Sequence, residues 1–159
     1  VAIAGARLKD AKISNEALIG ETVNVTLAVT KAAKLEFVTT GKGATELSVP
    51  EGKFLNSSIT TAKGKAEDSI SFGAASIVKG AFISLGKGSD TLTFSGRMKG
   101  KTTVESGKGR DLIEVNSKDR GKGKLVLSDF NKKDTLVVGD ETFTTKNLED
   151  APNWVKFEA

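Results

Sequence analysis

The 159-residue chain contains no cysteine and no histidine. Without cysteine it can form no disulfide, no thiolate metal site and no thiol nucleophile, although the cellular compartment stays open. Without histidine it cannot assemble a Ser-His or Cys-His pair, and it cannot bind zinc through an imidazole. The sequence therefore excludes those nucleophilic enzymes and those zinc proteins.

Aromatic residues, long apolar segments and helical patterns are also scarce. Only 38% of the residues are hydrophobic and 6% are aromatic, which favours a thin stacked core over a thick two-layer core. Apolar residues recur at period two almost throughout, so the sequence predicts an all-β protein. No apolar run approaches the length of a membrane span, and the N-terminus shows no signal-peptide pattern. Because the chain starts with Val1 and not with Met, we expect a processed form or a fragment.

The seventeen glycines are distributed with a sequence repeat. Residues 86–94 read Gly-Lys-Gly-Ser-Asp-Thr-Leu-Thr-Phe, and residues 107–115 read Gly-Lys-Gly-Arg-Asp-Leu-Ile-Glu-Val. In each copy a Gly-x-Gly-x-Asp turn leads into a strand in which polar and apolar residues alternate. Two glycines allow a tight turn or positive φ, and the alternating run directs one face of the strand inward. Each copy therefore predicts a turn followed by a half-buried strand.

Fainter copies extend the repeat in both directions, at residues 41–49, 64–72 and 132–138. The aspartate or threonine that marks each copy stands at positions 45, 68, 90, 111 and 134, so the steps are 23, 22, 21 and 23 residues. A second, weaker strand precedes each glycine turn, for example at residues 82–85 and 103–105. Self-similarity at a fixed period is typical of a solenoid, in which each repeat forms one coil.

The repeat predicts a single-domain β-solenoid of about five coils, with a period of 21–23 residues and atypical capping ends. We expect residues 1–40 to form an N-terminal cap or irregular strands, residues 41–138 the repeat region, and residues 139–159 a C-terminal cap or docking strand. Residues 139–143 predict a hairpin. The predicted interior column consists of Leu47, Val49, Ile70, Phe72, Leu92, Phe94, Ile113, Val115, Leu136 and Val138.

Residues 85–92 resemble the glycine- and aspartate-rich nonapeptide of the repeats-in-toxin (RTX) family, and the resemblance covers about residues 41–138. Residues 128–138 resemble the way in which such arrays close. The family forms calcium-stabilised β-rolls, usually acidic, with two turns in about 18 residues, whereas this chain has one turn per repeat and is basic. Leu85 and Ser106 also stand where the family usually has a further glycine. The resemblance therefore describes a degenerate relative.

The resemblance implies a candidate calcium site between the turns at residues 86–90 and 107–111. Calcium takes six to eight oxygen ligands, and stacked coils bring equivalent turns to about 4.8 Å from each other. The expected ligands are carbonyl groups near Gly86, Gly88, Gly107 and Gly109 and the carboxylates of Asp90 and Asp111. The alternative is that the turns hold no ion and the glycines serve backbone geometry alone.

Four lysines, Lys42, Lys65, Lys87 and Lys108, share one position of the repeat and should stack in a column. Like charges at this spacing repel by about 1 kcal/mol per pair in water. One hypothesis is that the lysines neutralise the aspartates of the turns in place of calcium. The alternative is a solvated edge whose charges prevent aggregation of the strands.

The sequence offers little support for an enzyme, because no carboxylate pair departs from the repeat as a catalytic pair should. We therefore expect a non-enzymatic structural or adhesive module that acts within an assembly on an extracellular or virion surface. Trp154 and Phe157 are the expected docking residues, and the expected partners are other subunits and an acidic surface or polysaccharide rather than nucleic acid. The second hypothesis is a calcium-dependent folding and export module, and the third is a polysaccharide-active solenoid enzyme.

Overall fold

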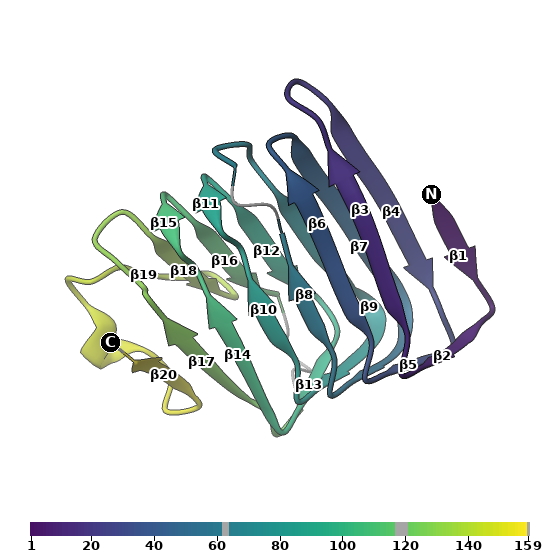
Figure 1. Cartoon of the computed structure of the whole chain (residues 1–159). Helices are drawn as coiled ribbons and strands as arrows, with labels where there is room; N and C mark the ends of the chain where they lie inside the picture. The colour runs from purple at the N-terminus through teal and green to yellow at the C-terminus, as the bar shows by residue number, and fades with distance from the viewer. Residues whose placement is uncertain (62–63, 117–120, 159) are drawn as a thin grey trace.

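The computed structural model describes residues 1–61, 64–116 and 121–158. The chain winds almost entirely as β-strands into a β-solenoid of about six coils, which confirms the predicted fold class (Figure 1). Equivalent strands of successive coils lie side by side and pair in parallel, from the N-terminal coil at one end to β20 at the other. Among the described residues, no helix is long and apolar enough to cross a membrane.

Two large sheets form the walls of the solenoid, and a two-stranded sheet lies at the glycine turns. The long sheet contains β1 (Ala2–Ala4), β2 (Arg7–Lys9), β4 (Thr22–Ala28), β5 (Lys31–Ala33), β7 (Ala44–Leu55), β9 (Ser69–Lys79), β12 (Thr91–Phe94), β13 (Arg97–Lys99), β16 (Leu112–Val115), β18 (Thr135–Val138) and β19 (Glu141–Phe143). The second sheet contains β3 (Lys12–Ala17), β6 (Glu36–Gly41), β8 (Ser58–Thr60), β10 (Phe82–Ser84), β14 (Lys101–Glu105), β17 (Lys124–Ser128) and β20 (Val155–Glu158). The small sheet pairs β11 (Lys87–Gly88) with β15 (Lys108–Gly109), and one short 3-10 helix, η1, spans Leu148–Asp150.

The long sheet bends and provides two sides of the solenoid. β7 pairs with β4 through residues 44–48 and with β5 through residues 53–55, so it runs along both sides. The register between β7 and β9 shifts between Val49 and Glu51, where the strands turn from one side to the other. We call the part formed by β2, β5, β13 and the second halves of β7 and β9 the short side; it lies along the lower edge in Figure 1.

The interior columns follow the predicted register. Leu92 is the partner of both Ile70 and Ile113, and Phe94 is the partner of Phe72 and Val115. All these side chains are buried, and the rings of Phe72 and Phe94 stack with centroids 5.2 Å apart. A second column from the other sheet faces them and consists of Phe37, Ile59, Ile83, Val104 and Leu127. Of the predicted column only Val138, near the C-terminal end, is half-buried.

The first 40 residues are more regular than their sequence suggests. β1 pairs with β4, β2 with β5 and β3 with β6, so this segment continues the same parallel ladders instead of forming irregular strands. The segment lacks the Gly-x-Gly-x-Asp motif, and one of its corners is formed without glycine. Asp10, Lys34 and Asn56 adopt positive φ of 46–52° at the corner where Gly80 stands in a later coil.

The C-terminal end departs from the repeat. β18 and β19 form the predicted hairpin and pair antiparallel, with Leu136 opposite Phe143. β20 then returns to the second sheet and pairs in parallel with β17. The aromatic rings of Phe130 and Phe157 contact each other with centroids 5.2 Å apart. These contacts cover the last coil.

Candidate functional site

The glycine turns are held together by a close approach of neighbouring coils. Gly88 and Gly109 are partners in the β11–β15 pair, and both have positive φ, at +147° and +155°. A Cβ atom on Gly109 would lie 1.4 Å from the carbonyl oxygen of Gly88, and one on Gly88 would lie 2.2 Å from that of Ala66. Both the positive φ and the close approach of the neighbouring coil therefore require glycine at the second position of the Gly-x-Gly-x-Asp motif.

The aspartates that end the turns form a buried ladder inside the solenoid. Each carboxylate accepts a hydrogen bond from the backbone N–H of the equivalent residue one coil earlier. The distances are 2.7 Å from Thr45 to Asp68, 2.8 Å from Asp68 to Asp90, 3.0 Å from Asp90 to Asp111, and 3.1 Å from Asp111 to Asp134. All four aspartates are at most 2% exposed. The regular spacing of the repeat thus places a row of ionisable carboxyl groups in the core.

Burial changes the acidity of this ladder. The Oδ2 atoms of Asp90 and Asp111 are buried and have no hydrogen-bond partner among the described residues. Loss of solvation raises the pKa of Asp90 to about 7 and that of Asp111 to about 6, and the backbone hydrogen bonds oppose this only in part. Burial also raises the pKa of Asp68. Asp90 and Asp111 therefore gain protons close to neutral pH.

The residues present fit the expected calcium site poorly. Asp90 and Asp111 direct their carboxylates into the solenoid, where one oxygen of each already accepts a backbone N–H. The carbonyl oxygen of Gly86 accepts the N–H of Lys108 at 3.0 Å. Within the described part of the chain, no group of three or more acidic side chains is arranged to hold a metal ion. Calcium binding through Gly86, Gly88, Gly107 and Gly109 stays a prediction.

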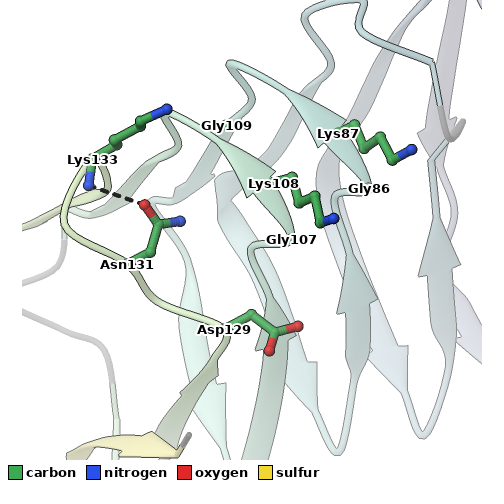
Figure 2. A pocket seen from close by; sticks show the side chains of 8 residues that line it. All are labelled: Gly86, Lys87, Gly107, Lys108, Gly109, Asp129, Asn131 and Lys133. Carbon is green, nitrogen blue, oxygen red and sulfur yellow. Dashed lines mark hydrogen bonds between the residues drawn. The ribbon is translucent and has the colours of Figure 1, made fainter.

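The lysine column lies outside the same turns. Lys42, Lys65, Lys87 and Lys108 are exposed, and Lys87 and Lys108 are register partners whose side chains lie side by side in Figure 2. Lys133 adds a further cation beside the groove that Lys87 and Lys108 line. None of these lysines forms an ion pair with the aspartate ladder in the described structure, because the carboxylates are inside. The hypothesis that lysine neutralises the turns therefore lacks a contact to support it.

The two expected docking residues contact their own chain. Phe157 packs against Phe130, and both are half-buried. Trp154 is half-buried, and its carbonyl oxygen accepts the N–H of Leu125 at 3.0 Å. These contacts belong to the covering of the last coil, and docking through this segment stays a prediction.

A second group of cations, which the sequence analysis missed, lies on the short side. Arg7, Lys31, Lys53 and Arg97 occupy one register row, in which only Ile77 is uncharged. The neighbouring row adds Lys79 and Lys99. We call these outward-facing, exposed residues the basic face; they are Arg7, Lys31, Lys53, Lys79, Arg97 and Lys99. Their positions follow the repeat period, and that spacing was the available signal.

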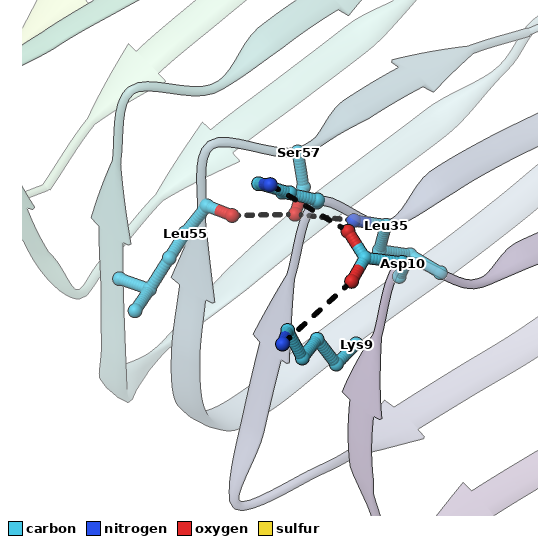
Figure 3. A network of polar contacts seen from close by, with 6 residues as sticks. Lys9, Asp10, Leu35, Leu55 and Ser57 are labelled. Atoms are coloured by element: carbon cyan, nitrogen blue, oxygen red, sulfur yellow. Dashed lines mark hydrogen bonds and ion pairs between the residues drawn. The ribbon is translucent and has the colours of Figure 1, made fainter.

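The basic face has almost no acidic counterpart. Glu51 is the one acidic residue in the strand segments that form the short side. The ion pairs among the described residues join Lys9 and Lys34 to Asp10, at 3.9 and 3.8 Å, and Lys12 to Glu36, so they leave these six cations unpaired. Asp10 lies at the corner next to this side, where Lys9 reaches it (Figure 3). The short side is therefore strongly positive.

The fold and surface define a β-solenoid protein with a buried aspartate ladder and two groups of exposed cations, the lysine column and the basic face. Comparisons with protein-family models, with curated protein sequences and with solved structures find no match. The RTX resemblance therefore stays a resemblance of sequence motif.

Proposed function

We propose that this protein is a non-enzymatic structural or adhesive module that attaches to an acidic polysaccharide through its basic face. The observation that carries the proposal is one register row, in which Arg7, Lys31 and Lys53 lie on neighbouring strands and Arg97 follows after Ile77. Neighbouring strands lie about 4.8 Å apart, so like charges in the row repel by roughly 1 kcal/mol per pair even in water. A linear polyanion along the row removes this repulsion, which supports a polymer over a small anion.

The surroundings of the row favour a polysaccharide over a nucleic acid. The uncharged outward residues of the short side include Ala33, Leu55 and Ile77, and none of its outward residues is aromatic. Proteins that bind single-stranded nucleic acid usually stack bases on aromatic side chains. A flat row of cations without stacking platforms suits a polymer that is recognised by its charge. The placement on an exterior surface is part of the proposal and draws its support from the resemblance to exported repeat proteins.

The test is a binding measurement with dextran sulfate as the acidic probe and neutral dextran as the reference. The variant Lys31→Gln, Lys53→Gln and Arg97→Gln removes three cations from the basic face. We expect the wild type to bind dextran sulfate and the variant to bind at least about tenfold more weakly, since each contacted anionic group releases counterions.

The matched control is the variant Lys101→Gln, Lys124→Gln and Lys156→Gln, which removes the same charge from exposed positions of the second sheet. We expect its affinity to stay close to that of the wild type. Equal losses in the two variants would show that net charge alone drives binding and would overturn the assignment to the basic face. Binding of a single-stranded oligonucleotide in preference to dextran sulfate would overturn the choice of polymer.

A further inference from the structure

Two adjacent apolar side chains are exposed at one corner of the solenoid. Leu18 is 55% exposed and Ile19 is 76% exposed. Elsewhere in the described chain, large apolar side chains are exposed only at the separate positions Val1 and Phe82. A single exposed apolar residue is ordinary on a protein surface, whereas a contiguous apolar patch marks an interaction site. The adjacent pair is therefore the feature that calls for a partner.

The pair is presented by an ordered turn. The backbone N–H of Glu21 donates to the carbonyl oxygen of Leu18 at 3.0 Å, and Gly20 has a φ of +80°. This is the hydrogen bond of a β-turn with glycine at the third position, where such a turn requires positive φ. The next coil supports the turn, because the N–H of Ala44 donates to the carbonyl oxygen of Glu21 at 2.9 Å. The turn therefore holds Ile19 at its tip.

The exposure of the pair follows from its place within the coil. Ala17 is the register partner of Gly41, so Leu18 stands where Lys42 stands one coil later. The lysine column continues this place through the following coils, and its residues are exposed although they lie between neighbouring coils. A side chain at this corner therefore points to solvent whether or not another coil is stacked beside it.

The apolar pair and the lysine column border one groove. Ile19 lines this groove together with three members of the lysine column, Lys42, Lys65 and Lys87. In Figure 1 the turn between β3 and β4 lies along the same edge of the solenoid as β11 and β15, which carry Lys87 and Lys108. We call this edge the turn edge; it consists of residues 18–21, 41–43, 64–67, 86–89, 107–110 and 129–133.

The turn edge carries an excess of positive charge. Its exposed cations are the lysine column with Arg110, Lys132 and Lys133. Its exposed acidic residues are Glu21, Glu67 and Asp129. Among the described residues, no ion pair joins these two groups. The turn edge thus combines an apolar tip with a row of cations.

We propose that the turn edge docks on the surface of an anionic lipid bilayer, with Leu18 and Ile19 inserted at the boundary of the acyl chains and the lysine column against the headgroups. Apolar side chains gain free energy by leaving water, and lysines are attracted by the negative surface potential of anionic lipids. Stable attachment takes two such signals together. A soluble polyanion would match the lysines but would leave the apolar pair in water. The inference is independent of the basic face, which lies on another side of the solenoid.

Co-sedimentation with lipid vesicles tests the docking. The probe vesicles contain phosphatidylcholine and phosphatidylserine, and the reference vesicles contain phosphatidylcholine alone. We expect the wild type to bind the reference vesicles at least about tenfold more weakly than the anionic vesicles. The variant Leu18→Ser and Ile19→Ser removes the apolar pair, and the variant Lys42→Gln, Lys65→Gln and Lys87→Gln removes three cations. Each should lower the partition coefficient to anionic vesicles at least about tenfold, because each removes one of the two signals.

The matched controls carry the same kinds of change at other surfaces. Phe82→Ser removes an exposed apolar side chain from the second sheet, and Lys31→Gln, Lys53→Gln and Arg97→Gln removes three cations from the basic face. Both should bind the anionic vesicles as the wild type does, and far-ultraviolet circular dichroism checks the fold of every variant. Equal losses in the two triple variants would show that net charge alone drives binding and would overturn the assignment to the turn edge. A wild type that does not sediment with anionic vesicles would overturn the proposal without affecting the result with dextran sulfate.

The variant Ile19→Trp reports insertion directly. Its emission spectrum is recorded with and without anionic vesicles and compared with that of the wild type, in which Trp154 is the only tryptophan. We expect vesicles to shift the emission of the variant to shorter wavelength and to change that of the wild type little, because an indole that leaves water emits at shorter wavelength. An unchanged spectrum in a variant that sediments with the vesicles would show that the turn stays outside the bilayer and would overturn the proposal.

Discussion

At the residue scale, the aspartate of the repeat motif is a core residue. Asp90 stands two residues before Leu92 and four before Phe94. Because side chains two apart along a strand point to the same face, the alternation already directs Asp90 inward. In the structure Asp90 accepts the backbone N–H of Asp68 on the preceding coil, in agreement with this alternation.

The buried ladder makes the stability of the protein depend on pH. The pKa of Asp90, about 7 in the folded protein, lies above its ordinary value of 3.8, so the folded chain binds more protons than the unfolded chain between these values. The protonated Asp90 and Asp111 stabilise the fold in full below about pH 4. This stabilisation is lost as the pH rises through about 6 and 7, the pKa values of Asp111 and Asp90. We expect a higher melting temperature at pH 5 than at pH 8.

The variant Asp90→Asn isolates this effect. Its amide oxygen can still accept the N–H of Asp68, but the group no longer ionises beside Asp111 and Glu67, whose charges also raise the pKa of Asp90. The difference in melting temperature between pH 5 and pH 8 should shrink. An unchanged difference would show that the pH dependence arises elsewhere in the molecule.

The second glycine of the turn gives a prediction at the same scale. Gly109→Ala places a Cβ atom 1.4 Å from the carbonyl oxygen of Gly88, so the two coils must separate or the strand must shift. We expect a loss of at least about 1–3 kcal/mol in the free energy of unfolding, measured with urea. Gly139→Ala is the control, since its φ is +60° and a Cβ there meets no atom within 4 Å. A similar loss in both variants would mean that backbone strain alone, and not coil stacking, fixes Gly109.

At the scale of the elements, the sequence predicted the strand ladders of the repeat region well. Residues that are one repeat apart become register partners on neighbouring strands, so the repeat period gives the register. The steps of 23, 22, 21 and 23 residues between marked positions agree with the register of Thr45 to Asp134 in the structure. The regular pairing of the first two coils was not predicted, since Asp10 and Lys34 form a corner that glycine marks elsewhere. The basic face escaped because its residues were judged singly and not by register. The RTX resemblance pointed to the turn motif, and the calcium site that it implies stays a prediction.

The interior column can be tested at its centre. Phe94 is 1% exposed and stacks on Phe72, so Phe94→Ala should lower the free energy of unfolding by about 3–5 kcal/mol. Phe82, on the outside of the second sheet, is 38% exposed, and Phe82→Ala should cost much less. If chemical unfolding gave equal losses for the two variants, Phe94 would not belong to a tightly packed column.

At the scale of the whole molecule, the surface is divided by charge. The net charge is only +4, yet the short side carries six cations that form no ion pair among the described residues, beside Glu51. The rest of the long sheet, formed by β4, β12, β16 and the first halves of β7 and β9, is different. Many of its outward residues are serine, threonine or asparagine, such as Asn24, Ser71 and Thr93. A repeat protein concentrates charge in this way because one position per coil becomes one row on the surface. The rigid stack then holds the cations in a line.

The most direct test of the account is the salt dependence of binding to dextran sulfate. The logarithm of the association constant is measured against the logarithm of the sodium chloride concentration, for the wild type and for the variant Lys31→Gln, Lys53→Gln and Arg97→Gln. Each cation that contacts the polymer adds about one to the magnitude of the slope, so the variant should lose about three. The control Lys101→Gln, Lys124→Gln and Lys156→Gln should keep the wild-type slope. A slope that is the same in all three proteins, or that falls equally in both variants, would contradict a binding row on the basic face.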